Sequence, residues 1–443
     1  MPTNLKPATA QLSGGERPYF DPIETAPRSE LRKLQEERLL QQLAFVGEHS
    51  PLIRKTWADA GVAVGDIKSI ADFTGRAPLI DKDSLRAWRD ANHDAFGGVL
   101  CVDPNAVDLM GTSSGTTGDP TFFGESWTHP GDWVWTPREM WGLGLRPGNY
   151  VAEFNHVLRS VGRLYFHDMG AIPILINHDA SDLKRFVDIS RKYRPIWLFH
   201  LSSPLIYGMA RLEAETGIDL KEVFSSYTAC IYGGEPMGKH ARELVERWNV
   251  PIYEFSSLGD SGTIWECRAK EGFHAWEDLV LLEVLDPVTN EPVPSGGRGE
   301  MVITNLVDRY DPLIRYRSGD LVQWTEERCK CGRTHARVWP LGRTGDEILV
   351  AGKSVLPRDI WGAIEDVPEC AAGLFQIIRP AREVDVLKLR VGYEGTADLG
   401  KLAEAVKASV GNAVGAPPDV VLVPNAEIVK LGPPHKIPRI AKA

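Results

Sequence analysis

The stretch from residue 150 to 260 constrains the fold more than any other part of the chain, because short β-rich runs alternate there with helical patterns. Runs such as "YVAEF", "IWLFH" and "YTACIY" are separated by segments such as "DLKRFVDISRKY" and "KHARELVERW". Strands joined through helices form βαβ units, and these units build parallel sheets. This part of the chain is therefore predicted to be α/β with a largely parallel sheet.

The pattern changes after residue 279. The runs "LVLLEVLD", "GEMVITNL" and "DLVQW" follow one another with turn residues between them and no helical spacer, which predicts an antiparallel subdomain. Beyond a Gly-rich segment near 341, "LKLRVGYEG" and "LGKLAEAVKASVG" predict a small α+β unit of about a hundred residues. We expect a large N-terminal domain over 1–342, a small mobile C-terminal domain over 343–443, and a hinge near 343–346.

An amphipathic helix is predicted near the N-terminus, in "SELRKLQEERLLQQLAFV", with Ser29 near its N-cap. Its apolar face consists of Leu31, Leu34, Leu39, Leu43 and Val46.

Composition excludes several classes of protein. The net charge of -10 gives no excess of cations to displace the counterions of a nucleic acid, so a general nucleic-acid binder is not expected. Six irregularly spaced cysteines in 443 residues do not predict a disulfide framework. No apolar run approaches the roughly 20 residues that span a bilayer, and the first residues lack the apolar segment of a signal peptide. We expect a cytoplasmic protein with no membrane partner.

The segment "GTSSGTTGDP" at 111–120 is rich in glycine and hydroxyl groups. Glycines allow close approach of a ligand, and successive N–H groups and hydroxyls can bind phosphate oxygens. The segment has neither the spacing of a Walker loop nor GxGxxG at a strand-to-helix turn. A polar surface turn is the alternative for the segment taken alone.

Six segments follow one another along the chain: "SSGTTGDPT", "YGGEPMG", "YEFSSLGDSG", "YRSGDL", "GRTGDEILVAGKSVLP" and "HKIPR". Together they resemble the adenylate-forming superfamily of acyl-CoA synthetases, in that superfamily's order. Three longer stretches are "YFDPIETAPRSELRKLQEERL", "DIKSIADFTGRAPLIDKDSLR" and "CGRTHARVWPLGRTGDEILV". More narrowly, these resemble the phenylacetate-CoA ligase family, and the resemblance spans about 19–440.

The resemblance implies a reaction in two steps. A carboxylate attacks the α-phosphate of ATP to give an acyl-adenylate and pyrophosphate, and the thiol of CoA then displaces AMP. Catalysis of the first step consists mostly of positioning and preorganised donors. Lys436, in "HKIPR", would contact the carboxylate and the α-phosphate, and with Thr116 it is an expected catalytic residue. The resemblance further implies that the small domain rotates between the steps. The β- and γ-phosphates would lie against Ser113, Ser114, Gly115, Thr116, Thr117 and Gly118.

Further nucleotide-binding residues follow from the same resemblance. Asp320 would accept hydrogen bonds from both ribose hydroxyls, and Arg343 would reach the ribose or a phosphate. Tyr253 would stack on or beside the adenine. A turn between strands and a surface guanidinium are the alternatives for Asp320 and Arg343. The segment against which adenine would lie consists of Gly233, Gly234, Glu235 and Pro236.

The chain departs from the family pattern at three places. Asp119 replaces the usual lysine after the last glycine of the loop, so one phosphate cation is missing. Ser257 stands where a magnesium-binding glutamate is usual, and Asp260 is the candidate to replace it. Gly345 stands at the usual Asp or Lys pivot and would itself permit rotation.

A zinc site is predicted from four residues. Cys329 and Cys331 form a tight CxC pair, and "CRAKEGFH" supplies Cys267 and His274. Three thiolates and one imidazole make a closed tetrahedral set, which is typical of structural zinc. The alternative is a group of unlinked residues, since free cysteine packs readily as a small hydrophobe. Some members of the resembled family carry zinc in a matching frame.

The resemblance implies ATP, CoA and Mg²⁺ as cofactors and an aromatic carboxylic acid as the partner substrate, with His156 and Ser160 lining its pocket. It also allows a homodimer. Two other functions stay open: an adenylyltransferase or acyl-protein synthetase that uses the same first step, and a non-catalytic nucleotide-binding relative, which Ser257 and Asp119 would favour.

Overall fold

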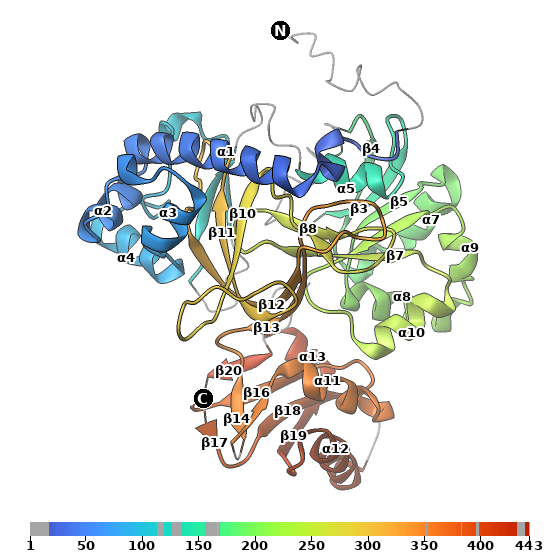
Figure 1. Ribbon diagram of the computed structural model, residues 1–443. Coiled ribbons are helices and arrows are strands. Elements are labelled where there is room, and N and C mark those ends of the chain that lie inside the picture. Colours follow the sequence, from blue (N-terminus) through green and yellow to red (C-terminus); the bar gives the residue numbers. More distant parts are fainter. Residues whose placement is uncertain are drawn as a thin grey trace. The chain divides into compact units, whose positions relative to one another are not determined.

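The computed structural model describes residues 17–112, 119–125, 135–155, 166, 169–350, 352–381, 383–395, 398–431 and 439–442. The chain divides into two compact units, each built from separated segments. Figure 1 labels the helices and strands of both units. Unit 1 comprises Met1–Asn149, His156–Ile172 and Tyr253–Leu341. Unit 2 comprises Tyr150–Asn155, Pro173–Ile252 and Gly342–Ala443.

Helices of unit 1 include the predicted amphipathic helix as α1, and its apolar face is largely buried. Ser29 lies near the N-cap, as predicted, but the N-cap is Pro27, α1 begins at Arg28, and no side chain caps the helix. Ser29 is the second residue of the helix and lies in its first turn. The ring of Pro27 fixes its φ, which suits the residue just before a helix. Ser50 ends α1 and caps the next helix, where its Oγ accepts from the N–H of Ile53. The helices are α1 (Arg28–His49), α2 (Pro51–Asp59), α3 (Ile70–Arg76), α4 (Lys82–Asn92) and α5 (Trp135–Gly142).

Strands of unit 1 are antiparallel, as predicted for the segment after 279. Their order is β10-β11-β12-β13-β9-β8-β7, with a separate β1-β2 pair. Two cores lie here, one beneath α1 to α4 and one among the strands. The strands are β1 (Leu109–Thr112), β2 (Phe122–Glu125), β7 (Ile252–Ser257), β8 (Thr263–Glu266), β9 (Phe273–His274), β10 (Val280–Leu285), β11 (Arg298–Asn305), β12 (Tyr316–Thr325) and β13 (Arg337–Arg343).

The first part of unit 2 contains the predicted parallel βαβ arrangement. Strand β5 pairs in parallel with both β3 and β6, and the order of the strands is β6-β5-β3-β4. Apolar side chains of strands and helices share one core, which includes Phe186 and Met209. The elements are β3 (Tyr150–Asn155), β4 (Ile172–Asn177), α7 (Leu183–Tyr193), β5 (Trp197–Leu201), α8 (Ser203–Thr216), α9 (Leu220–Phe224), β6 (Ala229–Tyr232) and α10 (Lys239–Arg247).

The C-terminal part of unit 2 is α+β, as predicted. Helices α11 and α12 pack on a four-stranded sheet of order β19-β18-β16-β20 and share its core. A boundary between the compact units falls between Leu341 and Gly342, one residue from the predicted domain boundary; independent movement of 343–443 stays a prediction. The elements are β14 (Ile348–Val350), β15 (Lys353–Val355), α11 (Pro357–Glu365), β16 (Phe375–Arg379), β17 (Glu383–Val384), β18 (Lys388–Tyr393), α12 (Leu399–Val414), β19 (Asp419–Pro424), α13 (Asn425–Val429) and β20 (Ile440–Lys442).

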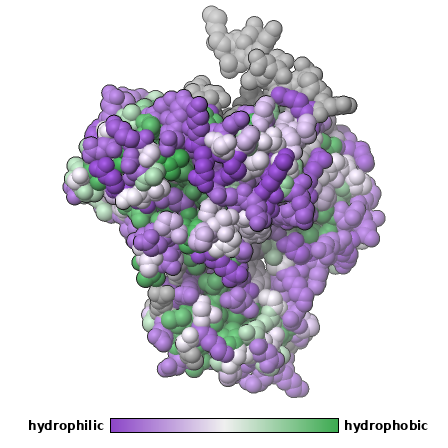
Figure 2. Space-filling view, viewed as in Figure 1, coloured by the Kyte–Doolittle hydropathy of each residue, from purple (hydrophilic) through white to green (hydrophobic). Residues whose placement is uncertain are grey.

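The visible surface is mainly hydrophilic, with smaller hydrophobic areas between the polar ones (Figure 2). Among the described residues, no helix is both long enough and apolar enough to span a bilayer.

Candidate functional site

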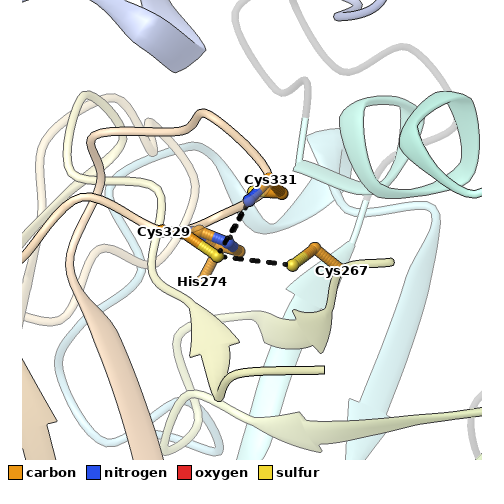
Figure 3. A group of neighbouring side chains, drawn as sticks. All are labelled: Cys267, His274, Cys329 and Cys331. Carbon is orange, nitrogen blue, oxygen red and sulfur yellow. Dashed lines mark hydrogen bonds between the residues drawn. The ribbon is translucent and has the colours of Figure 1, made fainter. Parts of the chain in front are cut away.

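Four potential metal ligands from separate segments of unit 1 meet at one place (Figure 3). Cys267 follows β8, His274 ends β9, and Cys329 and Cys331 lie between β12 and β13. Strand β9 pairs with both β8 and β13, which brings the three segments together. These are the four residues that the sequence predicted as a zinc site.

The four ligand atoms all lie within 4.8 Å of one another, and two of their distances match those around a single tetrahedral ion. Sγ of Cys267 lies 3.7 Å from Sγ of Cys329, and Sγ of Cys331 lies 3.4 Å from Nε2 of His274. Bonds of about 2.3 Å to sulfur and about 2.0 Å to nitrogen, at tetrahedral angles, separate two sulfurs by about 3.8 Å and sulfur from nitrogen by about 3.5 Å. The donor set therefore fits zinc, whereas a disulfide would need about 2.05 Å between the sulfurs.

Burial and mutual contact prepare these side chains to bind a cation. Cys267, His274 and Cys329 are buried, and Cys331 is half-buried. Burial lowers the pKa of His274, so its imidazole is neutral and can offer a lone pair. Contacts with the thiols of Cys267 and Cys329 lower the pKa of Cys331. Four ligands in a largely closed set are typical of a structural site.

The N-terminal segment, from Tyr19 to Glu24, holds a turn at 329–333 in place. This turn carries two of the four ligands and is called the cysteine turn. The hydroxyl of Tyr19 donates to the carbonyl of Cys331 at 2.8 Å, and the buried Glu24 accepts from Nε of Arg333 at 2.8 Å. Gly332 has a φ of +96°, and a Cβ there would lie 2.0 Å from the hydroxyl oxygen of Tyr19. Only glycine fits this turn, because a side chain would meet both strain and Tyr19.

Asp320, the predicted ribose ligand, lies half-buried in β12 of unit 1. Its N–H donates to Oγ of Ser318 at 3.0 Å, and the N–H of Gly319 donates to Oε1 of Glu300 at 3.2 Å. These bonds fix the backbone that carries the carboxylate. Contact with a ribose stays a prediction.

The predicted adenine segment, 233–236, directly follows β6 in unit 2. In parallel sheets, ligands bind outside the carboxyl ends of the strands, so the segment has the expected position for a binding loop. Gly234 has a φ of +104°, which suits glycine. The carboxylate of Glu235 is not turned to open solvent but forms an ion pair with Arg439 at 3.0 Å.

Tyr253 and Ser257 lie on β7. The ammonium of Lys270 lies 4.9 Å from the centre of the Tyr253 ring, a cation–π distance. Burial raises the pKa of the Tyr253 hydroxyl. Ser257 is exposed at the end of the strand. Stacking of Tyr253 on a base stays a prediction.

Asp260, the candidate magnesium ligand, lies between β7 and β8. Its Oδ2 accepts from the hydroxyl of Tyr316 at 2.8 Å and lies 3.1 Å from Nζ of Lys82. Magnesium takes about six oxygen ligands in octahedral geometry. One carboxylate that is already paired with an ammonium does not fit as the main holder of this ion, so phosphates and water would have to supply most ligands.

Asp119, which replaces the usual lysine of the family, lies against α4. Arg89 makes a bidentate pair with it, with Nη1 at 2.7 Å from Oδ1 and Nη2 at 3.1 Å from Oδ2. Nε of Arg86 lies 3.3 Å from Oδ2. Two cations therefore stand beside the position where the family lysine is expected. The signal that sequence reasoning missed is the helical spacing of Lys82, Arg86 and Arg89.

Arg343 ends β13 and is half-buried in unit 2. Contact of Arg343 with a nucleotide stays a prediction. The predicted site residues that lie outside the described residues are Ser113, Ser114, Gly115, Thr116, Thr117, Gly118, His156, Ser160 and Lys436.

Comparisons with known proteins cover most of the chain. No family model matches it. It is 31% identical over 388 residues to the phenylacetate-coenzyme A ligase of Thermus thermophilus, covering 84% of each protein. A 2-hydroxyisobutyryl-CoA ligase, solved in the postadenylation state with R3-HIB-AMP, has a TM-score of 0.83 and 27% identity over 97% of this chain and 93% of that one.

The same ligase, solved with 2-HIB-AMP and CoA in the thioesterification state, has a TM-score of 0.68 and 26% identity, again covering 97% of this chain and 93% of that one. The sequence comparison covers 84% of the chain and the structural comparison covers 97%, and both lead to CoA ligases. The chain therefore belongs to the phenylacetate-coenzyme A ligase family of acid–thiol ligases, within the adenylate-forming superfamily.

Proposed function

We propose that the chain joins an aromatic carboxylic acid to CoA at the expense of ATP, through an acyl-adenylate, with release of AMP and pyrophosphate. The observation that carries the proposal is the match, over 97% of the chain, to a CoA ligase bound to an acyl-AMP. In the first step a carboxylate oxygen bonds to the α-phosphorus and pyrophosphate leaves. In the second step the sulfur of CoA bonds to the acyl carbon, AMP leaves, and the thiol proton passes to solvent.

Each proposed role uses chemistry that the residue can supply. Asp320, as an ionised carboxylate, would accept from both ribose hydroxyls. Lys436 would stabilise the charge that grows on the α-phosphate. Arg343 would contact the ribose or a phosphate, and the loop 113–118 would hold the outer phosphates. The segment 233–236 would bind adenine together with Tyr253.

The acid is proposed to be an arylacetate or another aromatic acid. Its support is the phenylacetate-coenzyme A ligase of Thermus thermophilus, at 31% identity. His156 and Ser160 are the proposed pocket residues. A small branched hydroxy acid is the second candidate, because a 2-hydroxyisobutyryl-CoA ligase matches the fold over 97% of the chain.

Two metals belong to the proposal. Zn²⁺ would be structural, held by Cys267, His274, Cys329 and Cys331, whose spacing and burial support it. Mg²⁺ would arrive with the ATP phosphates and take Asp260 as one ligand at most. A cytoplasmic location and a homodimer complete the proposal; sedimentation of the purified protein tests the second.

The deciding experiment is a screen of pyrophosphate release with ATP, with and without CoA. The panel should contain phenylacetate, indoleacetate, hydroxylated and amino-substituted aryl acids, and 2-hydroxyisobutyrate. We expect release with at least one aromatic acid and a free acyl-CoA thioester when CoA is present. Background release with every acid would contradict the proposal. AMP retained on another acceptor would instead identify an adenylyltransferase.

Replacement of the proposed catalytic lysine gives the matching test within the chain. Lys436→Ala should lower the rate of pyrophosphate release on the order of 10² to 10³, as loss of one preorganised donor does. Lys430→Ala removes an exposed lysine at the end of α13 and serves as the control. Equal rates for the two variants would remove the role given to Lys436.

A further inference from the structure

Four contacts hold the side chain of Arg439 in place. Its Nη2 lies 3.0 Å from Oε2 of Glu235, and its Nη1 donates to the carbonyl of Gly373 at 2.6 Å. The guanidinium lies 3.7 Å from the ring centre of Trp361 and 4.7 Å from that of Phe375. Only 10% of the Arg439 side chain and 5% of the Glu235 side chain are exposed.

The pair joins two distant parts of unit 2. Glu235 belongs to the loop after β6, whereas Arg439 directly precedes β20, and its carbonyl accepts from the N–H of Ile377 in β16 at 2.7 Å. The guanidinium therefore connects the C-terminal sheet to the segment that we propose binds adenine. The two residues lie 204 positions apart in the sequence.

A second contact between the same two parts lies next to this pair. Oε2 of Glu365, in α11, accepts from the backbone N–H groups of Lys239 at 2.5 Å and of His240 at 3.3 Å. These groups open α10, whose own N-cap Gly238 offers no side chain. A Cβ at Gly238 would lie 2.1 Å from Oε1 of Glu365, so the approach requires glycine. Glu365 thus caps α10 from the C-terminal part of the unit.

Two other ion pairs across this contact are exposed. Lys239 pairs with Asp366, with side chains 57% and 53% exposed, and Arg211 pairs with Glu394, with both side chains 65% exposed. Exposed pairs contribute little, whereas a buried charge that loses its partner is costly. Of these three pairs, Glu235–Arg439 therefore favours this arrangement most strongly.

The matched ligase gives a reason to connect this contact with one half of the reaction. Its two structures, named for the postadenylation and thioesterification states, have TM-scores of 0.83 and 0.68 to this same chain. The two states of that protein therefore differ from each other in structure, and this chain resembles the first more. A contact such as Glu235–Arg439 can then favour one half-reaction over the other.

We propose that Arg439 is a positioning residue for adenylation, which acts through its ion pair with Glu235. The ion pair separates during thioester formation. Lys436 precedes Arg439 by three residues, which span at most about 11 Å. Anchoring Arg439 to the loop after β6 therefore limits how far Lys436 can lie from that loop. This inference rests on the proposed function.

The test measures the two half-reactions of the full-length enzyme separately. Arg439→Met keeps the length of the side chain and removes the charge. We expect pyrophosphate release without CoA to fall on the order of 10- to 100-fold, because displaced reacting groups cost about that much. Thioester formation from supplied acyl-adenylate and CoA should stay within about twofold, since the pair is absent in that step. Arg439→Lys keeps a positive charge and should show the same split with a smaller loss.

Controls separate positioning from general damage. Lys239→Ala removes an exposed ion pair between the same two parts and should leave both half-reactions unchanged. If Arg439 acts only through its ion pair with Glu235, adding Glu235→Gln to Arg439→Met should not lower the rate of pyrophosphate release any further. Equal loss of both half-reactions, or no loss in either, would overturn the proposal. A wild-type enzyme that releases no pyrophosphate with any acid would instead contradict the proposed function.

Discussion

Two regions of the molecule differ in how far their ion pairs are buried. Near the cysteine cluster of unit 1 (Cys267, His274, Cys329 and Cys331), two pairs have both partners buried: Arg138 and Asp278 are each 2% exposed, and Arg333 and Glu24 are 6% and 0% exposed. Lys330, between two of the cysteines, forms a more exposed pair with Glu271. Across the contact between α10 and the C-terminal part of unit 2, the pairs Lys239–Asp366 and Arg211–Glu394 are more than half exposed, whereas the Glu235–Arg439 pair is buried.

This difference in burial determines how much free energy it costs to separate each ion pair during a reaction cycle. Removal of one partner from a buried pair leaves an uncompensated charge in a medium of low polarity, so separating such a pair is costly. Exposed charges exchange their partner for water at little cost. The region around the cysteines, with its two buried pairs, is therefore suited to permanent structure. Of the three pairs named in unit 2, two are exposed and separate at little cost, so Glu235–Arg439 sets the main ionic cost of opening this contact.

Loss of the metal ligand should have the largest effect. Cys329→Ser should reduce bound zinc from about one ion per chain to background and lower Tm by about 10 °C or more, because metal binding supplies folding free energy. Zinc content and calorimetry measure both effects. Cys101→Ser is the control, since burial raises the pKa of Cys101 to about 12 and it lies outside the cluster. A wild-type protein that binds no zinc after exposure to the ion would contradict this assignment.

Breaking the buried pair should have the next largest effect. Arg138→Met leaves Asp278 without its bidentate partner, whose contacts are 2.7 Å and 2.9 Å. The expected cost is about 3–5 kcal/mol, seen as a fall in Tm of about 5 to 10 °C by calorimetry. Addition of Asp278→Asn should recover part of the loss, because the stranded charge is then gone. If the second change lowers Tm further, the pair is not the source of the effect.

Low pH should reduce the folding stability of unit 1, because His335 becomes protonated. Its Nδ1 accepts from the N–H of Glu277 at 2.9 Å, and burial, the largest cause, lowers its pKa from 6.5 to about 4. The unfolded chain therefore binds the proton more readily, and up to about 3 kcal/mol of stability should be lost as pH falls from 6.5 to 4.

Calorimetry between pH 5 and 7.5 should show this slope, and His335→Gln should weaken it. Zinc content measured in the same samples separates this titration from release of the metal by acid. An unchanged slope in His335→Gln would assign the acid sensitivity to another group.

The smallest effect is expected at the exposed contact of unit 2. Lys239→Ala should leave Tm within about 1 °C of the wild type, because exposed ion pairs contribute little to stability. A large fall in Tm, measured by calorimetry under the same conditions, would show that this contact is as permanent as the region around the cysteines.

Local patterns in the sequence predicted the type of each part. The alternation in 150–260 predicted parallel strands, and β5 does pair in parallel with β3 and β6. The runs after 279 predicted the antiparallel strands β10 to β12. The cysteine and histidine residues also meet as predicted. Ser29 lies near the N-cap of α1, as predicted, but the cap itself is Pro27.

Partners of charged side chains could not be predicted in the same way. Helical spacing could have indicated that Arg86 and Arg89 share one face of α4, but not that both would meet Asp119. The pairing of Arg333 with Glu24 crosses 309 positions. Such contacts depend on how whole elements pack, which no short stretch of sequence encodes.

The sequence by itself determined which strands and helices form, which family the segments resemble and which residues could bind a metal, because periodicity and ligand chemistry act over short distances. The tertiary structure decided that Glu235 meets Arg439, that Lys82 meets Asp260, and that the N-terminal segment holds the cysteine turn. Charge alone leaves many partners open, and only the packing of distant elements selects one and sets how far it is shielded from water.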